Sequence, residues 1–389
     1  RGFMMRYPES NRLHKRMLRA SRRLHAVVDR DRAWKEARTR LWRAQCNCPY
    51  WHGVFGGLYL PHLREAVYRE LIAVERWVAP GLPHVEFGDF DLDGDDDALI
   101  ETHDWAAWVS ARGGALWALD DRRRGRNWGD TLARRPEAYH EALEQALVGG
   151  GEGASIHRAI RSREAGLSDL AKRQDERPRD MFLERWIDAG KEAGGAELGK
   201  SAGAALRAGG PAGVPGTFSY SSERFRFVES GSHEIVLAFP EGDAPGMLKR
   251  YRVDERGALT AGIELSSSRA RSGSLEVTLG LGVHVPEAPD RFMCVNGARA
   301  RPAHFAARSS HDRVRELSLV DLCDRTKLDV TIDRDARLER DPIETVSLSE
   351  AGAERVFQGL EARFSFDVAI EPGASWSVQF TLSPGGAME

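Results

Sequence analysis

The densest group of side chains that could do chemistry lies in the glycine-rich segment 45–62, QCNCPYWHGVFGGLYLPH. Its ring-bearing residues near the centre are Tyr50, Trp51, His52, Phe55 and Tyr59. Such a loop either fills a domain interface or offers a sugar a stacking surface, with Asn47 and His52 as polar neighbours for the sugar hydroxyls. Composition alone favours the interface, because buried aromatic residues are common.

Two other groups could hold a metal ion. Cys46 and Cys48 lie close to His52, but no second Cys or His pair follows at the spacing of a zinc site. The acidic run from Asp91 to Asp97 contains the glycine at the wrong position for an EF-hand and has no glutamate at the twelfth place. We therefore assign no metal ligand and predict no cofactor, and interpret the acidic run as a solvated turn between strands. Calcium bound in the β-sandwich stays an open alternative without assigned ligands.

Two catalytic signatures occur only as letter matches in the Gly/Ala-rich stretch. Residues 194–201 read GGAELGKS, the pattern of a phosphate loop, and residues 199–203 read GKSAG, the pattern of a nucleophile elbow. The glycine-rich pieces at 149–153 and 193–216 do not lie between a clear strand and a helix, which both motifs require, so we expect neither nucleotide binding nor a serine nucleophile. The 59 acidic residues cannot be reduced to a catalytic pair, because such a pair is defined by its separation and by one raised pKa. The sequence therefore identifies no catalytic residue.

Three amphipathic helices surround the aromatic segment. Apolar residues recur at helical spacing from Leu13 to Val28, again from Trp34 to Ala44, and again from Leu63 to Val78. Ser10 and Asn11 are candidate N-caps of the first helix, and Pro61 stands near the start of the third. Residues 10–82 are therefore predicted to form a three-helix domain.

The rest of the chain is predominantly β. Residues 83–389 contain alternating runs, beginning at Ala115, Trp117 and Leu119 and continuing at 259–265, 275–285, 328–332, 364–370 and 376–382. The last two runs flank Glu371-Pro372-Gly373, which predicts a hairpin. The stretch 137–189 is predicted to be partly helical, and the Gly/Ala-rich stretch 190–216 to be a flexible insertion. The fold class is thus α+β, with the three-helix domain followed by a large antiparallel β-sandwich.

Composition excludes several classes of protein. The 389 residues are 41% hydrophobic and 30% charged with a net charge of −3, so a nucleic-acid partner is not expected. No apolar run is long enough for a membrane span. Cysteines occur only at 46, 48, 294 and 323, which suggests no disulfide framework and a cytoplasmic location. Because the chain begins with Arg1 rather than Met, we expect it to be cut from something longer.

Several segments resemble glycoside hydrolase family 57, in its 4-α-glucanotransferase and α-amylase branch. The segment AQCNCPYWHGVFGGLYLPHLR, with YPESNRLHKRML upstream, resembles the last conserved block of that family. Three further segments resemble parts of the family's C-terminal β-sandwich: residues 127–140, 155–167 and 341–359. The resemblance implies a β-sandwich of the galactose-mutarotase-like supersandwich type, and an enzyme that cleaves or transfers α-1,4-glucan with retention.

The resemblance carries site residues over only for the block that is present. It implies that Gln45, Asn47, Tyr50, Trp51 and His52 line the substrate cleft, and it leaves Phe55 and Tyr59 as packing residues. Cys48 stands where the family pattern has Asp. The resemblance reverses the preference based on composition and favours a ligand contact for Trp51.

The family's nucleophilic Glu and acid/base Asp belong to an N-terminal barrel that no segment here matches, and residues 1–9 resemble the end of that barrel. The expected partners are therefore an α-glucan or maltooligosaccharide and the catalytic barrel of the same protein, with a homodimer as an open alternative.

Three hypotheses follow. The chain could supply a cleft wall and brace a catalytic barrel, being inactive alone. It could be a non-catalytic carbohydrate-binding module, for which further aromatic candidates are Trp105, Trp108, Trp117 and Trp128. It could also be purely structural, in which case sugar touches none of these residues.

Overall fold

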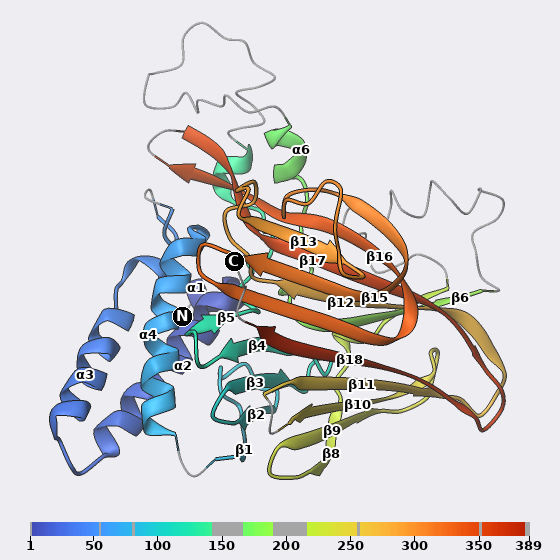
Figure 1. Cartoon of the computed structure of the whole chain (residues 1–389), viewed down its shortest axis with the longest axis horizontal. Helices are drawn as coiled ribbons and strands as arrows, with labels where there is room; N and C mark the ends of the chain where they lie inside the picture. Colours follow the sequence, from blue (N-terminus) through green and yellow to red (C-terminus); the bar gives the residue numbers. More distant parts are fainter. Residues whose placement is uncertain are drawn as a thin grey trace, which may run out of the picture.

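The computed structural model describes residues 2–53, 56–79, 82–141, 166–189, 216–254, 257–349 and 352–385. The predicted flexible insertion, except for Gly216, lies outside these ranges, as does most of the segment between Glu141 and Gly166. In Figure 1 the N-terminal helices lie against one side of a large β structure. Within the described residues, no helix is both long and apolar enough to span a membrane.

The N-terminal part of the chain is a small helical unit. Its elements are α1 (Gly2–Arg6), α2 (Pro8–Ala26), α3 (Arg32–Ala44), η1 (Cys48–Tyr50), η2 (Gly57–Tyr59) and α4 (Pro61–Val78). The apolar faces of the three long helices form one cluster around Leu13, Leu41 and Leu71. The three predicted amphipathic helices are therefore confirmed.

The start and end of the first long helix differ from the prediction. Helix α2 begins at Pro8 after Tyr7, because proline is suited to the first helical turn, so Ser10 and Asn11 were wrong as N-caps. Ser10 is instead buried, and its hydroxyl donates to the carbonyl of Tyr50 at 2.6 Å. The helix ends at Ala26, which leaves Val28 exposed rather than on its apolar face. Asp31 caps α3 by accepting from the Trp34 amide at 2.8 Å.

The remaining described residues form strands and two short helical turns, α6 (Leu167–Ala171) and η3 (Tyr220–Ser222). The strands are β1 (His84–Gly88), β2 (Asp97–Glu101), β3 (Trp105–Ser110), β4 (Leu116–Asp121), β5 (Arg126–Asn127), β6 (Met181–Asp188), β7 (Thr217–Ser219), β8 (Arg226–Ser230), β9 (Glu234–Phe239), β10 (Gly246–Val253), β11 (Leu259–Ser266), β12 (Arg271–Leu281), β13 (Arg291–Val295), β14 (Ala298–Arg299), β15 (Ser309–Asp321), β16 (Thr326–Ser349), β17 (Gly352–Ile370) and β18 (Ser375–Gly385).

All described strand pairings are antiparallel, and they define two layers. One layer runs β8–β9–β10–β11–β18 and continues into the first part of β16. The other runs β1–β2–β3–β4–β6–β12–β17 and continues into the second part of β16. Strands β15 and β16 thus belong to both layers (Figure 1). The predicted α+β class, with helices followed by a large antiparallel supersandwich, is confirmed.

A single apolar cluster fills the space between the layers. It combines residues of the first layer, such as Ile263 and Val378, with residues of the second, such as Leu275 and Val277. Strand β11 is buried at alternate residues as its sequence pattern predicts. Strand β12 ends at Leu281, so Val285 lies beyond it and is exposed.

The predicted hairpin between the last two strands is wrong. Strand β17 pairs with β12 and β16, whereas β18 pairs with β11 and β16. The two strands face each other across the sandwich, where the rings of Phe364 and Phe380 are 5.5 Å apart. Glu371-Pro372-Gly373 therefore connects the two layers. The prediction was wrong because a short turn of this kind can join two strands of one sheet or two strands in different sheets.

The strand predicted from Ala115, Trp117 and Leu119 forms as β4, but every residue in it is buried. The alternating pattern predicts a strand with one face exposed to solvent, and this part of the prediction is wrong because the helical unit covers the second face. Arg12 of α2 lies over the ring of Trp117 at 5.2 Å, and Arg16 lies over that of Trp108 at 4.6 Å.

Charged residues of the helical unit are buried where it meets the sandwich. Arg16 contacts Asp120 at 2.8 Å and also Glu75 of its own unit at 2.6 Å. Arg64 of α4 contacts Asp130 at 2.8 Å and donates to Gln358 of β17 at 2.9 Å. These contacts require the helices to lie in one orientation on the sheet.

The acidic run joins β1 to β2, so the predicted turn between strands is confirmed, but it is only partly solvated. Leu92, Asp93, Gly94 and Asp96 are exposed. Asp91, Asp95 and Asp97 are all buried. Burial, followed by the charge of Asp91, raises the pKa of Asp97 to about 8. The sequence did not indicate the buried residues, because Arg12, which contacts Asp91, lies 79 residues away in the chain.

Candidate functional site

The aromatic segment forms a loop between α3 and α4 whose backbone is fixed at Trp51. The Trp51 amide donates to the Cys48 carbonyl at 3.4 Å, and its carbonyl accepts from the Leu58 amide at 2.9 Å. Gly57 has φ of +52°, and a Cβ there would lie 2.2 Å from the Trp51 oxygen. Glycine is therefore required at this position, and the loop holds Trp51 in one place.

The indole of Trp51 is a large aromatic surface that the described part of this loop presents to solvent. Phe55, which was predicted to be a packing residue, lies outside the described residues. Trp51 is 50% exposed, while Tyr50 and Tyr59 on the same loop are buried. A Cβ on Gly53 would lie 3.0 Å from the indole, so the ring packs closely on that glycine. A half-exposed ring on a fixed backbone is suited to stacking against a flat apolar face.

The other predicted site residues are divided between surface and interior. Gln45 and Asn47 are exposed on the same loop as Trp51. Tyr50 points into the helical unit, where its hydroxyl donates to the Ala44 carbonyl at 2.6 Å. The structure thus brings Gln45, Asn47 and Trp51 to the surface, and gives Tyr50 the place of an anchor beneath them.

His52 is partly buried among tyrosines. Its ring meets Tyr59 edge-on at 4.5 Å and stacks with Tyr139 at 5.7 Å. Burial lowers the pKa of His52, with the positive charge of Arg6 acting in the same direction and the negative charge of Glu137 opposing it. The imidazole is therefore neutral at neutral pH and suited to hydrogen bonding rather than to ion pairing.

A buried carboxylate that we did not predict lies beneath this loop. Glu137 accepts from Tyr7 at 2.6 Å and from Tyr59 at 2.8 Å. Gln358 of β17 donates to the Tyr59 carbonyl at 2.8 Å. Burial, and then the hydrogen bond to Glu137, raises the pKa of Tyr7 to about 12, so its hydroxyl stays protonated and donates.

These supporting groups could not be found from local spacing. Tyr59 was expected to be a packing residue, and its burial confirms this. Glu137 and Tyr139 belong to the segment 127–140 that resembles the family, but nothing in that segment indicates that it reaches the loop.

The structure also bears on the rejected alternatives. All four cysteines are free, and Cys46 and Cys48 are exposed. Across the described part of the chain, metal-ligand atoms of three residues gather only at Asp89, Asp91 and Asp97, not at Cys46, Cys48 and His52. Trp105, Trp108, Trp117 and Trp128 are buried, so the structure does not present them as binding surfaces.

The architecture defines a two-part protein, a helical unit docked on an antiparallel supersandwich. Two family models match the chain: "Alpha-amylase/4-alpha-glucanotransferase, middle domain" over residues 1–78, and "Alpha-amylase/4-alpha-glucanotransferase, C-terminal" over residues 89–380. The chain therefore belongs to glycoside hydrolase family 57 and comprises the middle and C-terminal domains of its α-amylase/4-α-glucanotransferase branch, as the resemblance predicted.

Named relatives agree with this assignment. The chain is 33% identical to a 4-α-glucanotransferase of Thermococcus kodakarensis over 384 residues, 95% of this chain and 50% of the relative. It is 28% identical to α-amylase 1 of Dictyoglomus thermophilum over 388 residues, 97% of this chain and 53% of the relative. The crystal structure of the 4-α-glucanotransferase of Thermococcus litoralis superposes with a TM-score of 0.70 at 24% identity, over 99% of this chain and 52% of that one. The chain thus spans about half the length of these relatives.

Proposed function

We propose that this chain forms one wall of the substrate cleft of an enzyme acting on α-1,4-glucan, and that its sandwich braces a catalytic barrel. The observation that carries the proposal is the half-exposed indole of Trp51 on a backbone held at both its amide and its carbonyl. Family membership supports glucan as the ligand. The glucan would stack on Trp51, with Gln45, Asn47 and His52 as candidates for hydrogen bonds to its hydroxyls.

The supporting groups give this wall its rigidity. Tyr50 is held by Ser10 of α2, and Tyr59 is held by Glu137 and Gln358 of the sandwich. The loop is therefore positioned by both domains at once, which reduces the ordering needed when a ligand binds. Catalysis itself is assigned to the barrel that relatives of this family possess, so the chain alone is expected to be inactive.

The test is calorimetric titration of the chain with maltoheptaose. Trp51→Ala should weaken binding about fivefold, because loss of one stacking contact costs on the order of 1 kcal/mol. Trp42→Ala is the matched control, since Trp42 is also an exposed tryptophan of the helical unit, at 56%. Equal affinities for parent and Trp51→Ala would favour the purely structural alternative. Release of sugar by the isolated chain would contradict its inactivity.

A further inference from the structure

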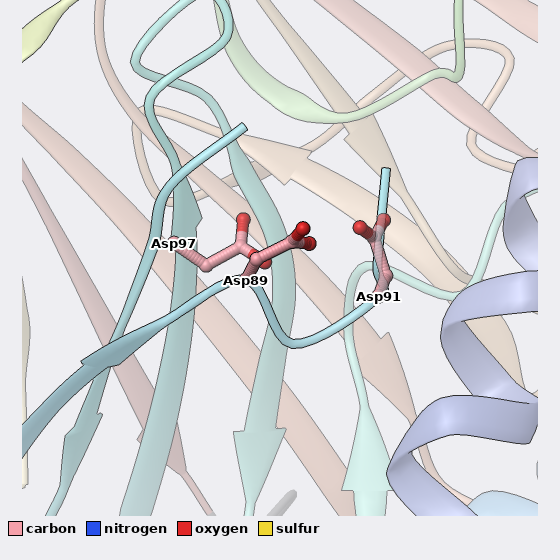
Figure 2. Close-up of side chains that lie close together, drawn as sticks. All are labelled: Asp89, Asp91 and Asp97. Carbon is pink, nitrogen blue, oxygen red and sulfur yellow. The ribbon is translucent and has the colours of Figure 1, made fainter. Parts of the chain in front are cut away.

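The turn between β1 and β2 gathers three carboxylates. Asp97 begins β2 and pairs in register with Gly88, so Asp89 follows directly beside it. One carboxylate oxygen from each of Asp89, Asp91 and Asp97 lies within 4.8 Å of the other two. Figure 2 shows the three side chains at this turn, with the carboxylate of Asp89 extending toward that of Asp91.

The negative charge of this group is only partly compensated by protein cations. Asp91 is 5% exposed and Asp97 is 2% exposed. Arg12 reaches Asp91 Oδ2 at 3.3 Å, but the same guanidinium also binds both oxygens of Asp180, at 2.7 and 3.2 Å. One guanidinium therefore serves two buried carboxylates, while burial of a charge requires a close partner.

A separate observation concerns one oxygen atom of this group. Asp91 Oδ1 is buried and has no hydrogen-bond partner, whereas Oδ2 of the same carboxylate faces Arg12. An unpartnered buried carboxylate oxygen is costly, and native structures rarely leave one without a proton donor or an ion. The orphaned oxygen belongs to the middle residue of the three-carboxylate group.

We propose that Asp89, Asp91 and Asp97 bind a calcium ion. All the ligand atoms are carboxylate oxygens, which suit a hard cation and not zinc. Oxygens at about 2.4 Å from one calcium ion can be up to about 4.8 Å apart, and the three carboxylate oxygens lie within 4.8 Å of one another. Magnesium demands shorter bonds and a stricter octahedron. Asp89 is only partly buried, so solvent reaches the group there and water can complete the coordination.

This ion would connect the two domains. Asp91 lies between the proposed ion and Arg12, and Asn11 of the same helix donates to the Asp91 carbonyl at 2.5 Å. Calcium binding at the turn therefore fixes the residue on which α2 rests. The proposal is independent of the glucan site, because it concerns different residues and a different ligand.

The experiment treats the whole chain with EGTA and then titrates it with CaCl₂ in a calorimeter, with MgCl₂ as a parallel titration. We expect one calcium site and a melting temperature that rises with calcium concentration. Asp97→Asn should weaken calcium binding by about tenfold or more, because affinity depends on the charge of the ligands. Asp89→Asn changes a less buried member of the same group and decides the question if Asp97→Asn does not fold.

Asp96→Asn is the matched control. Asp96 lies in the same turn, its side chain is 74% exposed, and it is not one of the three carboxylates. It should bind calcium as the parent does. The proposal is overturned if the parent shows neither heat nor a thermal shift at about 1 mM calcium, the weak end of protein modules. It is also overturned if magnesium binds equally well, or if Asp96→Asn loses as much affinity as Asp89→Asn.

Discussion

The space between the two β layers and the boundary between the helices and the sandwich are both buried, but they are built from different residues. The first is predominantly apolar, with Ile263 and Phe380 among its members, although it also holds the buried ion pair of Lys249 in β10 with Glu184 in β6. The second contains Arg12, Arg16 and Arg64, each with a carboxylate partner. Apolar burial is strong and has little directional preference, whereas guanidinium pairs require exact placement.

The difference indicates what each region contributes. A buried ion pair has a net effect near that of well-packed apolar residues, but loss of one member is expensive. The apolar interior therefore supplies most of the stability, and the charged boundary fixes how the helical unit lies on the sheet. Because the Trp51 loop is anchored from both sides of that boundary, its position depends on this orientation.

The largest effect should come from removing a cation at the boundary. Arg16→Met would leave the carboxylates of Glu75 and Asp120 buried without their shared partner. We expect a loss of about 3–5 kcal/mol in the free energy of unfolding, measured by urea titration with circular dichroism. Arg32→Met, at an exposed pair with Glu36, is the control and should change it by less than about 0.5 kcal/mol.

A companion variant tests whether the loss comes from unpaired charge. Adding Glu75→Leu and Asp120→Leu to Arg16→Met should restore most of the stability, leaving a deficit of about 1 kcal/mol because the Trp108 indole loses its acceptor. No recovery in this triple variant would mean that the ion pairs themselves stabilise the boundary.

The next effect concerns the apolar interior. Leu279→Ala removes a fully buried side chain of β12 and should cost about 3 kcal/mol, from lost transfer energy and the cavity that remains. It should leave maltoheptaose affinity unchanged, because the contacts that hold the Trp51 loop are intact. A change in sugar affinity with correct folding would show that the two regions are coupled.

The smallest effect is a dependence on pH at the boundary. Burial acts to raise the pKa of Glu9, but the charge of Arg135 and the hydrogen bonds from Arg135 and Ala133 outweigh it and lower that pKa below 4.5. A lowered pKa in the folded state stabilises the protein above about pH 4.5, and this contribution is lost as the pH falls through that range. Glu9→Gln should therefore be less stable than the parent at neutral pH, and the difference should shrink in acid. A constant difference at all pH values would contradict this assignment.

The elements that could be predicted are those whose signal is local. Apolar spacing located the three long helices, and alternation located β11, because both patterns reflect one buried face. The connection from β17 in one layer to β18 in the other could not be predicted, because Glu371-Pro372-Gly373 suits a hairpin within one sheet equally well. The layer that each strand joins depends on β11 and β12, about a hundred residues earlier.

The candidate site shows the same division. The glycines and aromatic residues of the loop indicated Trp51 as a candidate site residue, and the structure places Trp51 at the surface. Glu137 was not found, because its contacts to Tyr7 and Tyr59 form only when the helical unit docks on the sandwich. The burial of Asp91 in the acidic turn was missed for the same reason, since Asp91 is covered by Arg12 of the helical unit.

Strands β15 and β16 run through both layers, each bonded to different neighbours along its length. Neither layer can come apart without breaking strands that the other layer also uses. Amide protons in both layers should therefore exchange with solvent through one shared opening event. Under a pulling force, the two layers should unfold together rather than separate one after the other.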